Sequence, residues 1–139
     1  MELADTSAWW GSARVGGSLR REFAEAIVEG QVGTCDMVRL ELLHSARTID
    51  ELRMTRTDLD HLPDCAISTA QWRRALDVYE TLAGLSDKHQ RSVKHPDLLI
   101  AAAAEAAGVA VLHYDEDYDR IAAVTGQPTR WLAPRGSLD

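Results

Sequence analysis

The chain has 139 residues, of which 45% are hydrophobic and 27% charged, as in an ordinary globular domain. This length suffices for one substantial core, and we expect a single domain over residues 1–139. The sequence contains neither an apolar run of membrane-spanning length nor the pattern of a secretory signal. The net charge of −7 argues against nucleic-acid binding through a broad basic surface, but not against a metal-dependent nuclease, whose carboxylates are neutralised by cations.

The first half of the chain alternates short apolar runs with longer amphipathic ones, which is typical of an α/β domain with a mainly parallel sheet. The predicted elements are a strand, two helices, a strand and a long helix: Glu2–Asp5, Ser7–Arg14, Ser18–Glu29, Gln31–Cys35 and Asp36–Asp60. Gly16 and Gly17 separate the first two helices, and Gly30 ends the second. We expect Ser18 and Asp36 to be N-caps.

The second half continues the alternation after Pro63, which stops the long helix. A third strand is predicted at Cys65–Ile67, and a helix runs from Ser68 or Thr69 to about Leu82. The polar segment Leu85–Lys94 is expected to be a surface loop or a frayed helical extension. The remaining predicted elements are a helix, a strand, a helix and an edge strand: Asp97–Ala107, Val109–Leu112, Asp115–Val124 and Thr129–Leu132.

Four acidic residues fall where this topology gathers side chains at one edge of the sheet. Asp5 ends the first strand, Asp115 follows a later strand, and Asp97 lies in the first turn of its helix. In an open parallel sheet the carboxyl ends of the strands share one edge, and the crossover helices begin there. Glu41 lies roughly 8 Å along its helix from that edge. We therefore expect the four carboxylates to converge.

Each acid also has an ordinary structural explanation. Asp5 could cap the following helix, and Asp97 suits the positive end of a helix dipole. Asp115 or Asp117 could cap the last helix, and Glu41 could be solvated. Such roles are the more common ones for any single acid, so only the joint placement favours a shared function.

Carboxylates held together need a counter-ion, because a pair ~5 Å apart repels by about 3 kcal/mol at an effective dielectric constant of about 20. A hard divalent cation removes this repulsion, and ligands made only of oxygen favour Mg²⁺ or Mn²⁺ over zinc. Water bound to such an ion ionises more easily and supplies a nucleophile for attack on a phosphodiester. The pattern thus indicates metal-assisted phosphodiester cleavage.

Four short motifs, in order along the chain, resemble those of PIN-domain proteins. They are Asp5-Thr6-Ser7-Ala8, Arg39-Leu40-Glu41-Leu42, His95-Pro96-Asp97-Leu98-Leu99-Ile100-Ala101-Ala102 and Asp115-Glu116-Asp117-Tyr118. The length and the ending Trp131-Leu132-Ala133-Pro134 are similar to those of VapC-type toxins of bacterial toxin–antitoxin pairs. The similarity covers essentially the whole chain.

The resemblance implies a PIN-like α/β fold, with a central, mainly parallel sheet of about four or five strands flanked by helices. It implies that Asp5, Glu41, Asp97 and Asp115 bind Mg²⁺ or Mn²⁺ at a catalytic centre to which Asp117 contributes. The expected activity is that of a cytoplasmic endoribonuclease toxin, inhibited by a cognate antitoxin. We expect a homodimer or a toxin–antitoxin hetero-oligomer.

Two positions depart from the family pattern. His113 stands where a small hydroxyl residue is common, and Tyr118 replaces the commoner phenylalanine. His113 is expected to leave the metal ligands intact, but to alter substrate contact or the hydrogen bonds around them. An acid–base role for His113 is the sharper alternative to a plain polar residue at a strand end.

Adjacent tryptophans follow the first motif. Successive helical residues point about 100° apart, so Trp9 and Trp10 cannot both be buried equally. We expect one in the core and the other exposed beside the acidic edge, where it contacts an antitoxin or, alternatively, stacks on a base.

Other chemistries find little support. Cys35 and Cys65 form no CxxC pair and are interpreted as free thiols of a reducing cytosol. The histidines form no HExxH motif, and neither GxSxG nor a phosphate-binding glycine loop occurs. Two alternatives remain open, namely a catalytically silent binding module that uses the acidic edge for partner recognition, and a receiver-type phosphoryl-transfer protein. A phosphoaspartyl phosphatase would carry a second acid two residues after its aspartate. Asp5 has no such acid, which argues against this kind of phosphoryl-transfer protein.

Overall fold

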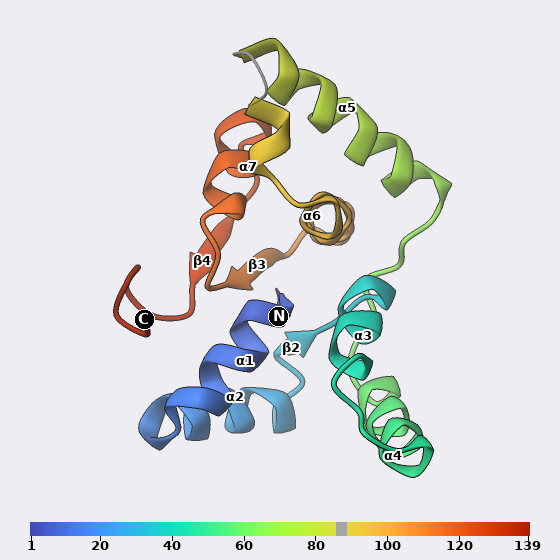
Figure 1. Cartoon of the computed structure of the whole chain (residues 1–139), viewed down its shortest axis with the longest axis vertical. Helices are drawn as coiled ribbons and strands as arrows, with labels where there is room; N and C mark the ends of the chain where they lie inside the picture. The colour runs from blue at the N-terminus through green and yellow to red at the C-terminus, as the bar shows by residue number, and fades with distance from the viewer. Residues whose placement is uncertain (86–88) are drawn as a thin grey trace.

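The computed structural model describes residues 1–85 and 89–139, and its centre is a sheet of four parallel strands (Figure 1). The strands are β1 (Glu2–Ala4), β2 (Val32–Gly33), β3 (Ala110–His113) and β4 (Thr129–Trp131). Their order is β2-β1-β3-β4, so the first strand lies inside the sheet. The predicted α/β class with a parallel sheet is confirmed, with four strands.

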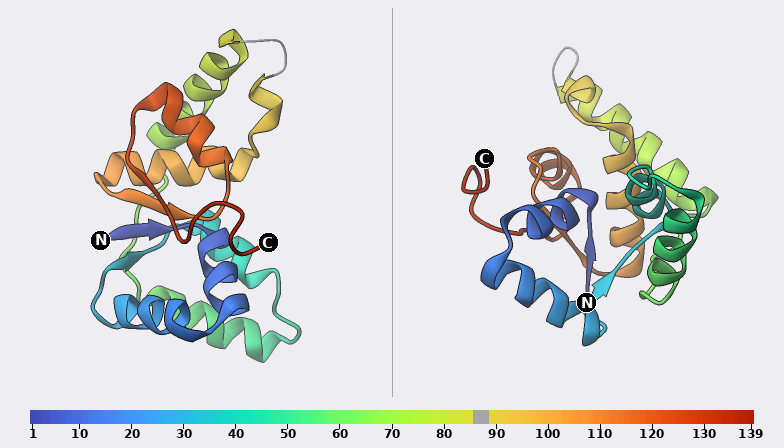
Figure 2. Two further views of the ribbon diagram at one scale, coloured as in Figure 1. Left: turned by 90° about the vertical axis from the view of Figure 1, so that its left-hand side faces the viewer. Right: turned by 60° about the horizontal axis from the view of Figure 1, so that its bottom comes forward.

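Helices surround the sheet. They are α1 (Thr6–Val15), α2 (Gly17–Val28), α3 (Asp36–Leu43), α4 (Ile49–Asp60), α5 (Thr69–Leu85), α6 (His95–Ala107) and α7 (Asp117–Thr125), with a 3₁₀ turn, η1 (His89–Ser92). Figure 2 shows α1 and α2 on one side of the sheet and α5, α6 and α7 on the other. No helix in the described part of the chain combines the length and apolar character that a membrane crossing requires.

Alternation along the strands divides the apolar side chains between two cores. Leu3 and Val111, which pair across β1 and β3, belong to the core under α5, α6 and α7. Ala4 and Leu112, the next pair, belong to the core under α1 and α2. This period of two is the reason why both faces of the sheet are covered by helices.

Helix α6 lies at the centre of the larger core. Every residue from Asp97 to Ala104 is buried, because apolar or small side chains occupy all sides of the helix. Gly108 ends the helix in the left-handed conformation (φ 70°), which favours glycine at this position. The alanine run therefore packs α6 closely between the sheet and α5, and it fixes the first turn of α6 at the edge of the sheet.

The long helix predicted at Asp36–Asp60 is wrong, since two helices occupy this segment. The chain leaves the helix after Leu43 and starts again at Ile49, where the Thr48 side chain accepts a hydrogen bond from the backbone N–H of Glu51. The Glu51 carboxylate accepts one in return from the backbone N–H of Arg47. These reciprocal bonds at the helix start explain the break.

Three predicted local features are also wrong. Cys65–Ile67 is not a strand, because this segment reaches the sheet only through an isolated bridge between Thr34 and Asp64. Ser18 is not an N-cap, since α2 begins at Gly17. Asp36 is likewise the first helical residue of α3, and Cys35 is the cap.

The other predicted boundaries agree within a few residues. Helix α5 continues to Leu85, and part of the predicted loop Leu85–Lys94 forms η1, while residues 86–88 of that loop lie outside the described residues. The last helix begins at Asp117 rather than Asp115, which leaves Asp115 in the connection between β3 and α7.

Candidate metal centre

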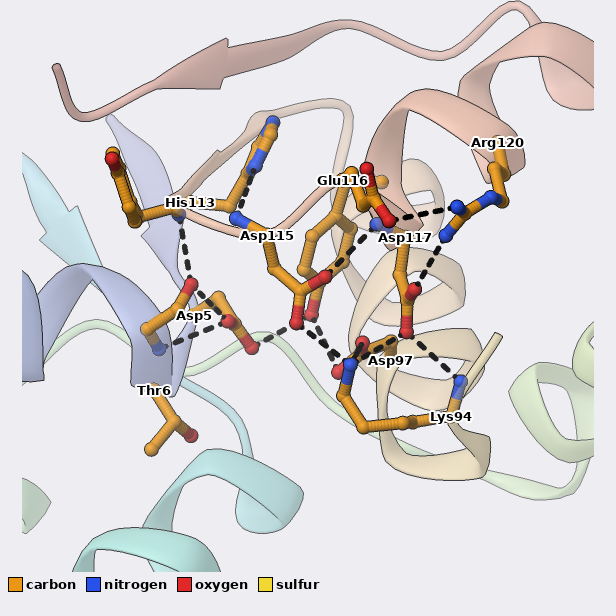
Figure 3. Close-up of polar contacts among 12 residues, drawn as sticks. Asp5, Thr6, Lys94, Asp97, His113, Asp115, Glu116, Asp117 and Arg120 are labelled. Atoms are coloured by element: carbon orange, nitrogen blue, oxygen red, sulfur yellow. Dashed lines mark hydrogen bonds and ion pairs between the residues drawn. The ribbon is translucent and has the colours of Figure 1, made fainter. Parts of the chain in front are cut away.

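The carboxyl edge of the sheet places acids from separate segments side by side. Asp5 directly follows β1, and its backbone N–H donates to the carbonyl of Leu112 on β3. Asp115 and Asp117 follow β3, and Asp97 lies in the first turn of α6. Figure 3 shows these side chains pointing toward a common centre. The structure therefore brings together four of the five acids that the sequence singled out.

Three of these carboxylates form the most compact group. Asp97, Asp115 and Asp117 each offer an oxygen within 4.8 Å of the other two. Asp97 and Asp117 are almost completely buried, whereas Asp115 is half-buried at the rim. We call these three residues the acid triad. Asp117, which the resemblance gave only a contributing role, is thus as well placed for metal binding as Asp97 and Asp115.

The ammonium of Lys94 stands among the triad (Figure 3). Its Nζ lies 2.8 Å from Oδ2 of Asp115, 2.8 Å from Oδ2 of Asp117 and 3.4 Å from Oδ2 of Asp97. Partial burial disfavours its charged form, but the hydrogen bonds to Asp115 and Asp117 outweigh this and raise the pKa of Lys94 above its usual value. The triad therefore attracts a cation strongly.

Asp97 is the least satisfied member of the triad. Its Oδ2 is buried and accepts no hydrogen bond, because Lys94 Nζ at 3.4 Å is too distant for a good one. Burial raises the pKa of Asp97 to about 9, and the neighbouring carboxylates of Asp117 and Asp5 add to the rise. A carboxyl with a raised pKa and an unused oxygen is a group that gains from a metal ion.

Asp5 is held from two sides. Its Oδ2 accepts hydrogen bonds from the backbone N–H and the hydroxyl of Ser7, at 3.0 and 2.6 Å, so that Asp5 also caps α1. Its Oδ1 accepts a hydrogen bond of 2.7 Å from the hydroxyl of Tyr118. This hydroxyl also lies 3.3 Å from Oδ1 of Asp97, and so connects Asp5 to the triad. The capping explanation and the shared placement are both correct for Asp5.

Glu41 lies beside the group rather than within it. Its Oε1 accepts a hydrogen bond of 2.8 Å from the hydroxyl of Thr6, the residue after Asp5. Burial raises the pKa of Glu41, and the charge of Asp5 contributes in the same direction, whereas Lys94 and Thr6 lower it. The hydrogen bond to Thr6, the neighbour of Asp5, places Glu41 at the margin of the acidic edge.

The connection between β3 and α7 is fixed by its own hydrogen bonds. Oδ1 of Asp115 accepts the backbone N–H of Asp117, and Nδ1 of His113 accepts that of Asp115. Burial lowers the pKa of His113, which favours the neutral ring. Because Nδ1 of this neutral ring accepts a hydrogen bond, the proton of the ring is on Nε2. His113 is buried against the rings of Tyr118 and Trp131, and its effect on the site is to orient Asp115.

The site offers only oxygen ligands, and one buried carboxylate oxygen accepts no hydrogen bond. The ammonium of Lys94 among the acids shows that they attract a positive charge. These features fit a divalent cation. Hard cations such as Mg²⁺ and Mn²⁺ prefer carboxylate oxygens, and Mg²⁺ needs only a few protein ligands because it retains waters. The triad meets these requirements, with Asp5 hydrogen-bonded alongside it. The residues present therefore fit a bound dication of this class.

Three contributors to the site were not assigned from the sequence. The sequence predicts only a polar loop at Lys94, although its position three residues before Asp97 is a signal for a pair on one helical face. Ser7 belongs to the first motif, but its spacing indicates no specific role. Tyr118 departs from the family pattern, and nothing in the sequence indicates that its hydroxyl reaches Asp5.

An apolar cavity of about 420 Å³ lies between α1, α3 and α4. Its apolar lining includes Trp9, Trp10, Leu42, Leu59 and Leu62. Trp9 packs edge-on against Phe23 at 5.0 Å, whereas 47% of Trp10 is exposed. One tryptophan is thus packed and the other exposed, as predicted. Trp10 also lines a smaller cavity together with Glu41, so it joins the apolar cavity to the acidic edge.

Comparisons with known proteins agree with this geometry. The model of the PIN domain family matches residues 3–124. Ribonuclease VapC18 of Mycobacterium tuberculosis is 46% identical over 134 residues, which cover 96% of each chain. Ribonuclease VapC51 of the same organism is 41% identical over 122 residues, covering 88% of this chain and 87% of the relative.

Solved structures share the fold at lower sequence identity. A toxin–antitoxin complex from Klebsiella pneumoniae contains a chain with a TM-score of 0.69 and 18% identity, covering 96% of this chain and 98% of that one. A DNA-bound VapBC structure from Salmonella typhimurium gives a TM-score of 0.70 and 17% identity, covering 96% and 100%. The matched family model and the extent of the VapC relatives lead to one conclusion: the chain belongs to the PIN-domain family, in its VapC-type branch.

Proposed function

We propose that the protein is a metal-dependent endoribonuclease that cleaves RNA phosphodiesters with a metal-activated water, and that it acts as the toxin of a toxin–antitoxin pair. The observation that carries the proposal is the acid triad, with the unused buried oxygen of Asp97 and the ammonium of Lys94 among its carboxylates. The ribonuclease names of relatives up to 46% identical support the same activity.

Asp97, Asp115 and Asp117 would hold Mg²⁺ or Mn²⁺, which would supply an easily ionised bound water and positive charge for the scissile phosphate. Asp5, fixed by Ser7 and Tyr118, faces the same centre. Glu41 at the margin has a pKa raised by burial, which suits its carboxylate for accepting a proton from the attacking water.

The test is cleavage of a labelled RNA with the purified chain in Mg²⁺, in Mn²⁺ and in EDTA. We expect cleavage with either metal and none with EDTA. Asp97→Asn and Asp115→Asn should abolish cleavage, whereas the matched control Asp77→Asn, an exposed acid on α5, should cleave at the parental rate. Cleavage in EDTA, or parental cleavage by Asp97→Asn, would show that the proposed mechanism is wrong. Metal binding without cleavage would favour the silent binding module instead.

A small cognate antitoxin is the proposed inhibitor. The apolar cavity beside Trp10 suits an apolar segment of such a partner, and its continuation toward Glu41 places the partner next to the acidic edge. The complexes in which related folds were solved support this assignment. The product of an adjacent reading frame should co-purify with the chain and stop cleavage, and Trp10→Ala should weaken that binding.

Three further expectations belong to the same proposal. The chain acts as a single domain over residues 1–139, in the cytoplasm, where Cys35 and Cys65 stay reduced. It assembles either as a homodimer or as a hetero-oligomer with the antitoxin. Light scattering of the chain alone and of the co-purified complex distinguishes the two assemblies.

A further inference from the structure

Lys94 is the group at the acidic edge that the proposed chemistry does not use. Its Nζ contacts all three carboxylates of the triad, with two hydrogen bonds of 2.8 Å and one ion pair of 3.4 Å. Among the described residues, the other cation that contacts the triad is Arg120, which reaches Asp117 alone. The ammonium thus faces the three carboxylates that would bind a metal ion, and it donates hydrogen bonds to two of them.

The burial of the partners is unequal. The side chain of Lys94 is 60% exposed, whereas those of Asp97, Asp115 and Asp117 are 5%, 22% and 4% exposed. The ammonium therefore covers the triad from the solvent side and can move into water without disturbing the core. Separately, the backbone N–H of Lys94 donates to Oδ2 of Asp117 at 2.9 Å, so its backbone keeps a fixed place when its side chain departs.

An ammonium among the three carboxylates opposes the binding of a dication by the same group. The two positive charges repel at short distance, and both are attracted to the same carboxylates. Without the ammonium, the clustered carboxylates would repel one another, so the Lys94 contact stabilises the metal-free state. The apparent metal affinity is then the intrinsic affinity multiplied by the fraction of molecules in which the triad is free of the ammonium.

We propose that Lys94 is a built-in competitor of the metal ion, which neutralises the acid triad in the metal-free protein and must leave when the dication binds. This inference rests on the proposed function for the existence of metal binding, and it adds a residue that sets the affinity. If Lys94 occupies the triad about nine-tenths of the time, its removal tightens metal binding about tenfold.

Calorimetric titration of Mn²⁺ into the full chain tests the proposal directly. Lys94→Met keeps the length of the side chain and removes the charge, so we expect about tenfold tighter binding. Lys94→Arg restores a cation and should return the affinity toward the parental value. Arg120→Met is the matched control, because it removes a charge that contacts only Asp117 among the triad and should change the affinity much less.

Thermal unfolding separates competition from a merely structural role. Lys94→Met should lower the melting temperature in EDTA, and saturating Mn²⁺ should remove this difference from the parent. A difference that persists in Mn²⁺, or unchanged Mn²⁺ affinity, would overturn the role of Lys94 and leave the proposed function standing. Equal tightening by Arg120→Met would overturn it as well. If neither the parent nor Lys94→Met bound Mn²⁺, the metal-dependent function itself would fail, and this inference with it.

Discussion

The hydroxyl of Tyr118 on α7 donates a hydrogen bond to Oδ1 of Asp5, the residue that follows β1, across 113 positions of the sequence. Tyr118 is completely buried, and burial, together with the charges of Asp5 and Asp97, raises its pKa well above the usual value. The hydroxyl therefore keeps its proton and remains a donor. One buried group thus sets the position of Asp5 relative to the acid triad.

Replacement of Tyr118 by phenylalanine should destabilise the protein and weaken metal binding. The ring still fills its place in the core, but the buried Oδ1 of Asp5 loses its donor, which costs about 1–3 kcal/mol. Urea unfolding in EDTA measures the loss, and Mn²⁺ titration measures the affinity. Tyr79→Phe, in which the altered ring packs on His95, is the control. Parental stability of Tyr118→Phe would contradict the assigned hydrogen bond.

Asp97 should make the metal-free protein less stable as the pH rises. Its pKa is raised to about 9, so between about pH 4 and pH 9 the folded state keeps a proton that the unfolded state has lost. The contribution of Asp97 to stability is accordingly lost as the pH rises, by at most about 1.4 kcal/mol per pH unit. Asp97→Asn should exceed the parent in stability at about pH 8, and by less at about pH 5. Urea unfolding in EDTA at both pH values measures the difference in stability. If the parent and Asp97→Asn had equal pH profiles of stability, the raised pKa of Asp97 would be refuted.

Metal binding should release a proton near neutral pH. A carboxylate must be ionised to bind a metal, and the raised pKa of Asp97 means that it is protonated in the metal-free protein. Mn²⁺ affinity should therefore rise with pH, by up to about tenfold per unit, and level off above about pH 9. Titration in two buffers of different ionisation enthalpy counts the released protons. Affinity independent of pH would argue against Asp97 as a ligand.

Ser7→Ala should loosen the acidic edge without removing an acid. The hydroxyl of Ser7 donates to Oδ2 of Asp5 and accepts the backbone N–H of Tyr114, at 2.6 and 2.8 Å. Its loss leaves that N–H without a partner and should cost about 1–3 kcal/mol. Ser7→Thr retains the hydroxyl and should recover most of the stability and of the cleavage rate. If Ser7→Ala matched the parent in both, the bridging role would be wrong.

Strand endings and helix starts made the position of the acids predictable. In a parallel sheet the strands end at one edge, and the crossover helices begin at that same edge. This rule predicts the positions of Asp5 and Asp97. The roles of Lys94 and Tyr118 did not follow, because each depends on where a side chain points across elements. Local spacing does not encode the contact of Tyr118 with Asp5.

The break between α3 and α4 could have been found. Thr48-Ile49-Asp50-Glu51 has the spacing of a capping box, and the structure forms its bond from the Glu51 N–H to the Thr48 hydroxyl, while the Glu51 carboxylate accepts from the N–H of Arg47. The apolar spacing from Val38 to Ile49 hid this signal, since it continues nearly in phase across the break. The false strand Cys65–Ile67 has a different cause, because a short apolar run also suits a buried connection, and Cys65 is indeed buried without a strand.

The inner position of β1 has a consequence for synthesis on the ribosome. Strand β1 pairs on one side with β3, which is synthesised about a hundred residues later. Asp5 therefore meets Asp115, Asp117 and Tyr118 only after the ribosome has added the residues of this later segment. A nascent chain that lacks β3 and α7 therefore cannot carry the assembled acidic edge, nor any chemistry that depends on it.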